Sequence, residues 1–201
     1  EIRHYLSWEK LDAFIPWKPA HLAYLTNYCD MLHLGIPWEE MVALLVIPRV
    51  DPAFIVGEDW LLAGAEELGV APRWLGERHP TKRPGRNAVQ RVADLLREKG
   101  FDRGRIGVEH KWMPVAVYDH LRSALPNAEF VPCDLLVPRI RFMKTEREQR
   151  LLQKSDEIGI RAMQAYMRAV RSGATRREAE RVRAECALAD GGEWVGGPYR
   201  L

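Results

Sequence analysis

The sequence has no apolar run that approaches the roughly 20 residues that a membrane-spanning helix needs. It has only three cysteines in 201 residues, and they form no CxxC pair and no obvious disulfide framework. Its 30 basic and 28 acidic side chains leave a net charge of +2, which gives no strong attraction to polyanions. We therefore expect no membrane partner, no nucleic-acid partner, and free thiols in a cytoplasmic protein.

Common catalytic signatures are also missing. The six histidines include no HExxH motif, no serine lies in a GxSxG elbow, and no GxxxxGK[ST] loop is present. Glu109 ends a predicted strand beside His110 and Lys111 and is a loose acid–base candidate, although an ordinary surface strand end is the simpler interpretation. The residues by themselves therefore assign no catalytic group and no metal ligand to this chain.

Residues 1–137 alternate short apolar runs with helical patterns. A continuous apolar run at 41–50, a break at Pro52 and a second run at 53–56 predict a buried hairpin. Further strands are predicted over residues 11–17, 105–110 and 129–133, and helices over residues 59–68, from Asn87 to Gly100, and from Pro114 onward. Interleaved strands and helices indicate an α/β layer sandwich, and the hairpin makes its sheet mixed.

The pattern changes near Pro138, where long helical periods replace the short runs. T-x-x-E capping boxes at Thr145 and Thr175 each predict the start of a helix. The first helix is expected over residues 146–171 with a stop at Gly173, and the second is expected to end at Gly191.

The two predicted helices each have an inward apolar face. On the first helix that face comprises Leu151, Ser155, Ile158, Ala162, Ala165 and Ala169, and on the second Ala179, Val182 and Cys186. These faces need a sheet that the rest of the chain does not supply, and the chain starts with Glu1 rather than Met. We therefore expect a domain over residues 1–137, followed over residues 138–201 by a linker and the opening helices of an incomplete second domain.

One segment between a helical stretch and the predicted hairpin stands out. It runs from Tyr28 to Trp38 and carries Asp30, His33 and a Gly-Ile-Pro break. Loops that hold aromatic and ionisable side chains often carry function. The alternative is a packed connecting loop whose aromatic side chains lie in the core.

Several short motifs occur in an order that resembles one enzyme family. The junction reads R-x-x-K-T-x-x-E from Arg141 to Glu148, and S-G-x-T-x-x-E follows the long helix from Ser172 to Glu178. Earlier pieces are Leu-Asp-Ala at 11–13, Tyr-Leu-Thr-Asn-Tyr at 24–28, Ile-Gly-Val-Glu at 106–109, and Leu-Pro at 125–126 before Phe130. Together they resemble the creatinase/aminopeptidase P/prolidase family of pita-bread Xaa-Pro peptidases, over nearly the whole chain.

The resemblance implies a fold and a division of labour. It implies a mixed-sheet creatinase N-terminal-like domain, a ribonuclease H-like layer sandwich, followed by the first helices of a pita-bread α+β domain. In the family two divalent metals, such as Mn, Co or Zn, are held by two Asp, one His and two Glu, and these ligands would all lie beyond Leu201. The parent protein is then expected to be the hydrolase, and this chain alone is expected to be inactive and to bind no metal.

The resemblance also implies a role for the N-terminal domain. In the family this domain mediates homodimerisation and can place a loop over the partner subunit's active site, which makes Tyr28, Asp30, His33 and Trp38 candidates for selecting substrate in trans. The substrate would be a short peptide or a small amide or amidine. Asn27 stands where the family usually has Gly. The branch therefore stays open among Xaa-Pro peptidases, metal-free creatinase-type C–N hydrolases and non-catalytic protein-binding or dimerisation modules.

Overall fold

The computed structural model describes residues 1–26, 28, 43–67, 69, 71–81 and 86–192. It divides the chain into two compact units, Glu1–Phe142 and Met143–Leu201. The first unit contains the sheet and its helices, and the described residues of the second form two helices. Each unit is described separately below.

The first unit is built on a mixed sheet whose order, within the described residues, is β4-β3-β2-β1-β5-β6. The strands are β1 (Ala13–Ile15), β2 (Ala43–Pro48), β3 (Ala53–Glu58), β4 (Leu75–Thr81), β5 (Arg105–Val108) and β6 (Glu129–Pro132). Strand β2 runs antiparallel to both β1 and β3, and the pairs β1–β5, β5–β6 and β3–β4 are parallel. All strands except β2 therefore point the same way.

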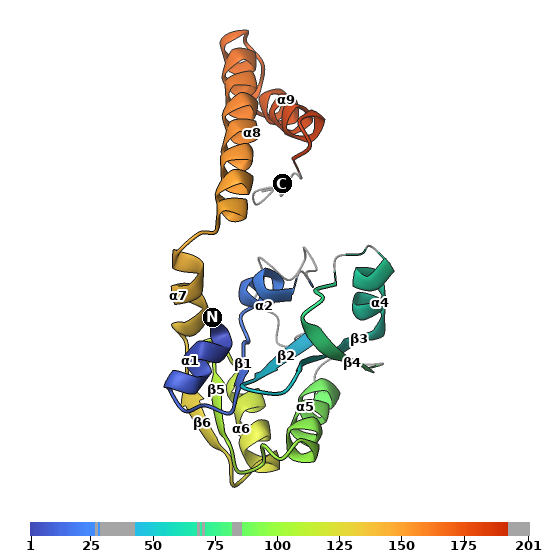
Figure 1. Cartoon of the computed structure of the whole chain (residues 1–201). Helices are drawn as coiled ribbons and strands as arrows, with labels where there is room; N and C mark the ends of the chain where they lie inside the picture. The colour runs from blue at the N-terminus through green and yellow to red at the C-terminus, as the bar shows by residue number, and fades with distance from the viewer. Residues whose placement is uncertain (27, 29–42, 68, 70, 82–85, 193–201) are drawn as a thin grey trace. The chain divides into compact units, whose positions relative to one another are not determined.

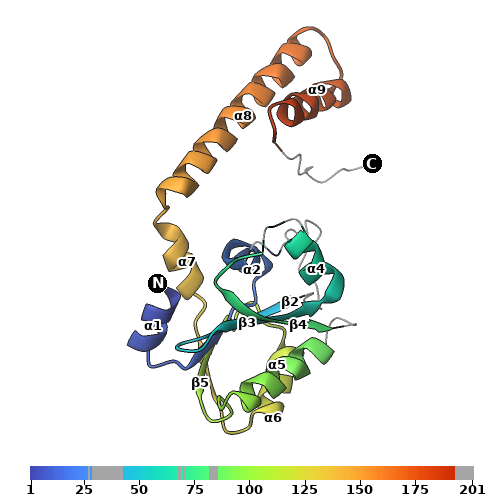
Figure 2. The same ribbon diagram turned by 45° about the vertical axis from the view of Figure 1, so that its right-hand side comes forward.

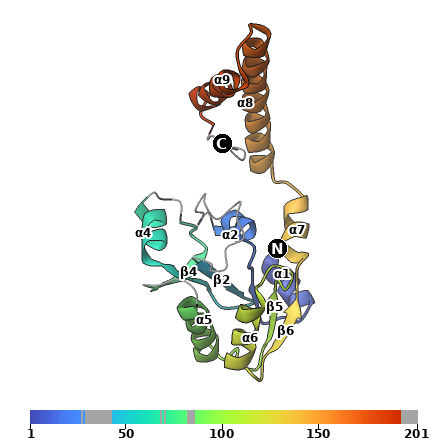
Figure 3. The ribbon, with the colours of Figure 1, turned by 180° about the vertical axis from the view of Figure 1, so that it is seen from behind.

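Helices cover both faces of this sheet. They are α1 (Ile2–Trp8), α2 (Pro19–Thr26), α4 (Asp59–Glu67), α5 (Arg86–Glu98), α6 (Val115–Ala124) and α7 (Leu136–Phe142). Figures 1 and 2 show α5 and α6 together below the sheet, with α2 and α4 above it. The view from behind in Figure 3 shows the same two layers, with α1 beside α7.

The core lies mainly along the central strands. Every residue of β2 is buried, and β3 is buried from Ala53 to Gly57. Large side chains with no exposed surface include Phe14, Leu45, Ile55, Leu96 and Ile106. Burying each such side chain contributes about 1.5–3 kcal/mol relative to leaving it in water. The prediction of a buried hairpin is confirmed by the antiparallel register that pairs Val46 with Phe54.

Two elements of the first unit are absent from the sequence predictions. Strand β4 carries Glu77, Arg78 and His79 at the edge of the sheet, where polar side chains stay partly exposed and the apolar period is lost. Helix α7 contains Pro138, near which the sequence pattern changes. Pro138 lies in the first turn of the helix, where a missing N–H costs no intrahelical bond.

The start of α5 also differs from the prediction. The helix begins at Arg86, so Asn87 lies inside it rather than before it. The predicted stop holds, because Gly100 has a φ of 80° just after the last turn.

The second unit consists, in its described part, of α8 (Glu146–Arg171) and α9 (Arg176–Ala189). Both predicted capping boxes are present: Thr145 and Thr175 accept a backbone N–H bond from the glutamate three residues on, whose carboxylate accepts in return. Gly173 adopts a φ of 87° in the turn between the helices, which a residue with a Cβ rarely does.

The buried face of α8 is shorter than predicted. Ile158, Ala162 and Ala165 are buried, whereas Leu151 is 58% exposed and Ser155 is also exposed. The reason is the length of α9, which has 14 residues against 26 in α8 and covers only part of it. On α9 Ala179 is buried as predicted, while Val182 and Cys186 are partly buried.

Candidate functional site

The carboxyl ends of β1 and β5 are the first place to look for a site. Within the sheet, β2 lies next to β1 on one side, and β5, which comes later in the chain, lies next to β1 on the other side. In open α/β sheets, ligands bind outside the carboxyl ends of the strands where the order reverses in this way. Here the residues that follow β1 lead into α2, and Glu109 follows β5.

Glu109 lies at this point with no exposed surface. Its Oε2 accepts hydrogen bonds from the backbone N–H groups of Trp17 and Lys18, each at 2.7 Å. Its Oε1 accepts from the Nδ1–H of His21, which is itself 3% exposed. Three donors therefore converge on one buried carboxylate.

These contacts make Glu109 a long-range cap for helix α2. The carbonyl of Lys18 accepts the N–H bonds of His21 and Leu22, at 2.8 and 3.0 Å, so the helical hydrogen bonds start at Lys18. A helix amino end leaves N–H groups without intrahelical partners and carries a partial positive charge. The carboxylate accepts the N–H of Lys18, where the helical hydrogen bonds start, and supplies a negative charge at this end although it is 91 positions away in the sequence.

The switch point is consequently closed by the protein itself. The interpretation of Glu109 as an ordinary surface strand end is wrong, because the carboxylate is buried and fully engaged. The neighbouring acid–base candidates do not converge on it either. The His110 ring packs edge-on against Tyr118 at 4.9 Å, and the backbone N–H of Lys111 donates to Asp134 at 2.8 Å.

The rim of this region carries an exposed aromatic side chain. The ammonium of Lys18 lies 4.1 Å from the centre of the Trp112 ring, and that tryptophan is 50% exposed. Such a contact favours the cation by about 0.5–1 kcal/mol at an exposed site. It directs the Lys18 side chain to the ring, while its backbone N–H serves Glu109.

Of the predicted substrate residues, Tyr28 is the one that the structure describes. It is 2% exposed, and its phenol oxygen accepts a hydrogen bond from Nε of Arg78 at 3.0 Å. Its backbone N–H donates to Oγ1 of Thr26 at 3.2 Å. Tyr28 is therefore an internal anchor here. Asp30, His33 and Trp38 lie outside the described residues.

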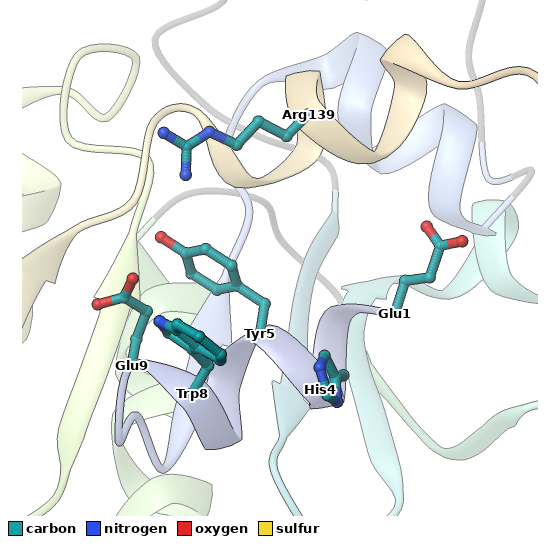
Figure 4. A pocket seen from close by; sticks show the side chains of 6 residues that line it. All are labelled: Glu1, His4, Tyr5, Trp8, Glu9 and Arg139. Carbon is teal, nitrogen blue, oxygen red and sulfur yellow. The ribbon is translucent and has the colours of Figure 1, made fainter.

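An open groove of about 470 Å³ lies between α1 and α7. Its lining comprises Glu1, His4, Tyr5, Trp8, Glu9 and Arg139. Figure 4 shows the Arg139 guanidinium above Tyr5, on the same side as Glu9. Burial and the nearby Glu9 carboxylate raise the pKa of Tyr5. Trp8 is 78% exposed at this groove.

Metal and thiol chemistry find little support in the described part of the chain. No group of three or more His, Cys, Asp or Glu side chains there is placed to hold a metal ion. These residues therefore do not fit a two-metal centre, and we assign them no step of a metal-dependent reaction. Burial raises the pKa of the Cys133 thiol to about 11, which leaves it an inert core residue at neutral pH.

Comparison with known proteins identifies the family. The family model for the creatinase/prolidase N-terminal domain matches residues 1–143. The chain belongs to the creatinase/prolidase N-terminal domain family. The matched range contains the whole sheet and helices α1 to α7, and its end lies one residue beyond the first compact unit. The predicted mixed α/β fold of a creatinase-like N-terminal domain is thereby confirmed.

Curated relatives agree with this family but are longer. A Sinorhizobium fredii protein described as uncharacterized hydrolase/peptidase y4tM is 29% identical over 163 residues, which are 77% of this chain and 40% of the relative. Creatinase from a Bacillus species is 32% identical over 87 residues, which are 43% of this chain and 21% of that enzyme. The chain thus spans less than half the length of the curated relatives it matches.

A solved structure extends the fold comparison. An Xaa-Pro dipeptidase from Bacillus anthracis superposes with a TM-score of 0.70 at 18% identity. The superposition covers 94% of this chain and 47% of the dipeptidase. The creatinase/prolidase N-terminal fold is therefore shared at low sequence identity, and the similarity continues past residue 143.

Sequence reasoning missed the buried His21 and named Glu109 only as a loose acid–base candidate at a surface strand end. His21 lies on a short helix without a marked apolar face, and its side-chain partner Glu109 is 88 positions away. The usable signal was Glu109 itself, since a carboxylate directly after the apolar run Ile106-Gly-Val108 must be paired if the strand end is buried.

No helix among the described residues is long and apolar enough to cross a bilayer.

Proposed function

We propose that this chain is the N-terminal part of an Xaa-Pro peptidase-like, metal-dependent hydrolase and serves dimerisation and substrate gating. The observation that carries the proposal is the match of residues 1–143 to the creatinase/prolidase N-terminal domain. The proposal is supported by the structural similarity to an Xaa-Pro dipeptidase, which covers 94% of this chain. The catalytic work belongs to residues outside this chain, consistent with Glu109 closing the switch point of the sheet.

The second unit fits the start of a catalytic domain in this proposal. Helix α8 buries one face against α9, and another stripe remains exposed, comprising Ile160, Met163, Met167 and Val170. A helix that is apolar on two sides normally lies inside a larger core. We propose that residues 138–201 open a pita-bread domain in the parent protein, which would hold two divalent ions such as Mn, Co or Zn.

The gating role concerns the residues that follow Tyr28. With Tyr28 anchored to Arg78, we propose that Asp30, His33 and Trp38 face the active site of the partner subunit in a cytoplasmic homodimer. Their aromatic, imidazole and carboxylate groups suit a short peptide. The test is the double variant His33→Ala, Trp38→Ala in the parent protein. We expect kcat/KM to fall at least about tenfold, which is about 1.4 kcal/mol of lost transition-state stabilisation.

A matched control keeps this test specific. Trp60→Ala removes another exposed tryptophan, 55% exposed on α4, whose indole N–H bonds to Glu58. We expect this control to leave kcat/KM unchanged. An unchanged kcat/KM in the His33 and Trp38 double variant as well would remove the gating role.

The activity itself is tested with the parent protein freed of metal and then loaded with Mn²⁺ or Co²⁺. We expect cleavage of Xaa-Pro dipeptides by the loaded protein and none by the 201-residue chain. The 32% identity to creatinase over 87 residues favours a second candidate, a metal-free creatinase-type C–N hydrolase. Turnover of creatine or a related amidine without added metal would select that candidate. Dimerisation with no turnover of any of these compounds would select a non-catalytic binding module.

A further inference from the structure

We infer that Glu109 is a positioning residue: its carboxylate takes the place of a bound anion at the amino end of α2 and thereby fixes α2 and Tyr28. The inference rests on the proposed function in one respect, namely that the chain leaves α2 and Tyr28 toward the residues proposed to face substrate. The positioning itself stands on contacts within the described part of the first unit.

The site around Glu109 is built for an anion. Among the described residues, three donors contact the carboxylate: the N–H groups of Trp17 and Lys18 on Oε2, and the Nδ1–H of His21 on Oε1. The location at the helix amino end adds a favourable dipole. A ligand phosphate or carboxylate occupies the corresponding place in many open α/β sheets. Here the strand end supplies the carboxylate in cis.

The contacts continue from this anchor to Tyr28. Helix α2 is only eight residues long, so its amino end and its carboxyl end are two turns apart. At its carboxyl end Oγ1 of Thr26 donates to the carbonyl of Leu22 at 2.7 Å and accepts from the N–H of Tyr28 at 3.2 Å. Arg78 then holds the Tyr28 phenol oxygen. Release of the amino end would loosen the helix that carries Thr26, the acceptor of the Tyr28 N–H.

Chemical rescue tests the inference directly. Glu109→Ala removes the carboxylate and leaves the donors of Trp17, Lys18 and His21 facing a space of its size. In the 201-residue chain we expect the melting temperature to fall by about 5–15 °C. Added formate should raise it again in a concentration-dependent way, and chloride at equal ionic strength should not. Glu129→Ala is the control, because Glu129 lies on the neighbouring strand β6 and forms an exposed salt bridge with Arg105.

The outcomes divide cleanly. Selective rescue of Glu109→Ala by formate, with no effect on the wild type or on Glu129→Ala, supports the inference. Equal effects of formate and chloride would overturn it. If Glu109→Ala does not fold, Glu109→Gln keeps the volume but turns one acceptor into a donor that faces other donors.

Amide hydrogen exchange of the Glu109→Gln variant measures whether Glu109 positions α2 and Tyr28. We expect the amides of α2 from Leu22 to Thr26, and that of Tyr28, to exchange at least about tenfold faster in Glu109→Gln, a change in local opening equilibrium. The amides of Ile106 to Val108 in β5 should keep their wild-type rates. Unchanged exchange in α2, or an equal rise across the whole first unit, would show that Glu109 only contributes to general stability.

Kinetics in the parent protein separate this inference from the proposed function. If the parent cleaves Xaa-Pro peptides, Glu109→Gln should raise KM more than it lowers kcat, because it disturbs placement and not the reacting groups. If the parent cleaves none of them, the proposed function fails. The formate rescue and the exchange rates still decide the positioning role in that case.

Discussion

The Nε–H of Arg78 donates to the phenol oxygen of Tyr28 across 3.0 Å, and this bond ties the residue after α2 to the edge strand β4. The same Nε lies 3.0 Å from a carboxylate oxygen of Glu66 on α4. Arg78 therefore joins three elements of the first unit through one side chain. Tyr28 is the first residue of the segment on which the gating proposal depends, and the structure describes how it is anchored.

Tyr28→Phe should lower the free energy of unfolding by about 0.5–1.5 kcal/mol, because it removes this bond and leaves the Arg78 donor to Glu66 and water. Tyr28→Ala should cost about 3–5 kcal/mol, because it also empties the space of a buried ring. Urea unfolding measures both. Tyr118→Phe is the control on a partly buried tyrosine, and a loss as large as that of Tyr28→Phe would contradict the assignment.

Thr145→Ala should destabilise helix α8 by about 0.5–2 kcal/mol, since it removes the side-chain acceptor at the helix start and half of the capping box. Ser155→Ala, at an exposed position in the middle of the same helix, removes a hydroxyl without touching a cap. Thermal melting followed by far-UV circular dichroism compares them. Equal melting of Thr145→Ala and wild type would show that the box does not hold the helix.

The hydrogen bond from Lys99 to Glu77, at 2.6 Å, is the largest cause of a lowered pKa at Glu77. A carboxylate with a lowered folded-state pKa stabilises the fold above its ordinary pKa of about 4.3, and this contribution disappears as the pH falls through the folded-state value. Lys99→Gln should therefore melt lower than wild type at about pH 7, and the gap should narrow below about pH 4.

The magnitude of this pH effect should be small, because the Glu77 side chain is 37% exposed and solvent screens the pair. Lys111 is an exposed lysine in the turn after β5, and Lys111→Gln serves as the control for loss of one positive charge. A gap between Lys99→Gln and wild type that stays constant from neutral to acid pH would show that the lysine acts through packing alone.

Cys133 should resist alkylation in the folded chain. With a pKa of about 11, only about one thiol in a thousand is ionised at pH 8, and the side chain is 5% exposed. Cys186 is partly buried on α9 and should react first of the two. Peptide mapping after iodoacetamide treatment, with and without guanidinium, measures the order. Labelling of Cys133 at the rate of Cys186 without denaturant would contradict its burial.

The elements that the sequence predicts best depend on local interactions. The β2–β3 hairpin follows from a continuous apolar run and a proline break, and α8 and α9 follow from T-x-x-E boxes whose partners are three residues apart. Strand β4 could not be predicted in this way, because an edge strand with Glu77, Arg78 and His79 has no apolar period.

The features that sequence reasoning missed depend on distant partners. The sequence does not predict the burial of Glu109, because its donors lie 88 to 92 positions away and the parallel pairing of β1 with β5 brings them together. The predicted inner face of α8 extends to Leu151 because the apolar period runs along the whole helix, whereas the 14 residues of α9 cover only part of it. The predicted roles of Asp30, His33 and Trp38 remain predictions.

The most direct test of the central proposal is the ratio of kcat/KM for an Xaa-Pro dipeptide to that for the matching Xaa-Ala dipeptide, measured with the Mn²⁺-loaded parent protein. Membership of the creatinase/prolidase N-terminal domain family and the dipeptidase-like fold lead us to expect a ratio of at least about 100, close to 3 kcal/mol of discrimination. A ratio near one, or no hydrolysis of either peptide by a folded, metal-loaded dimer, would contradict the proposal.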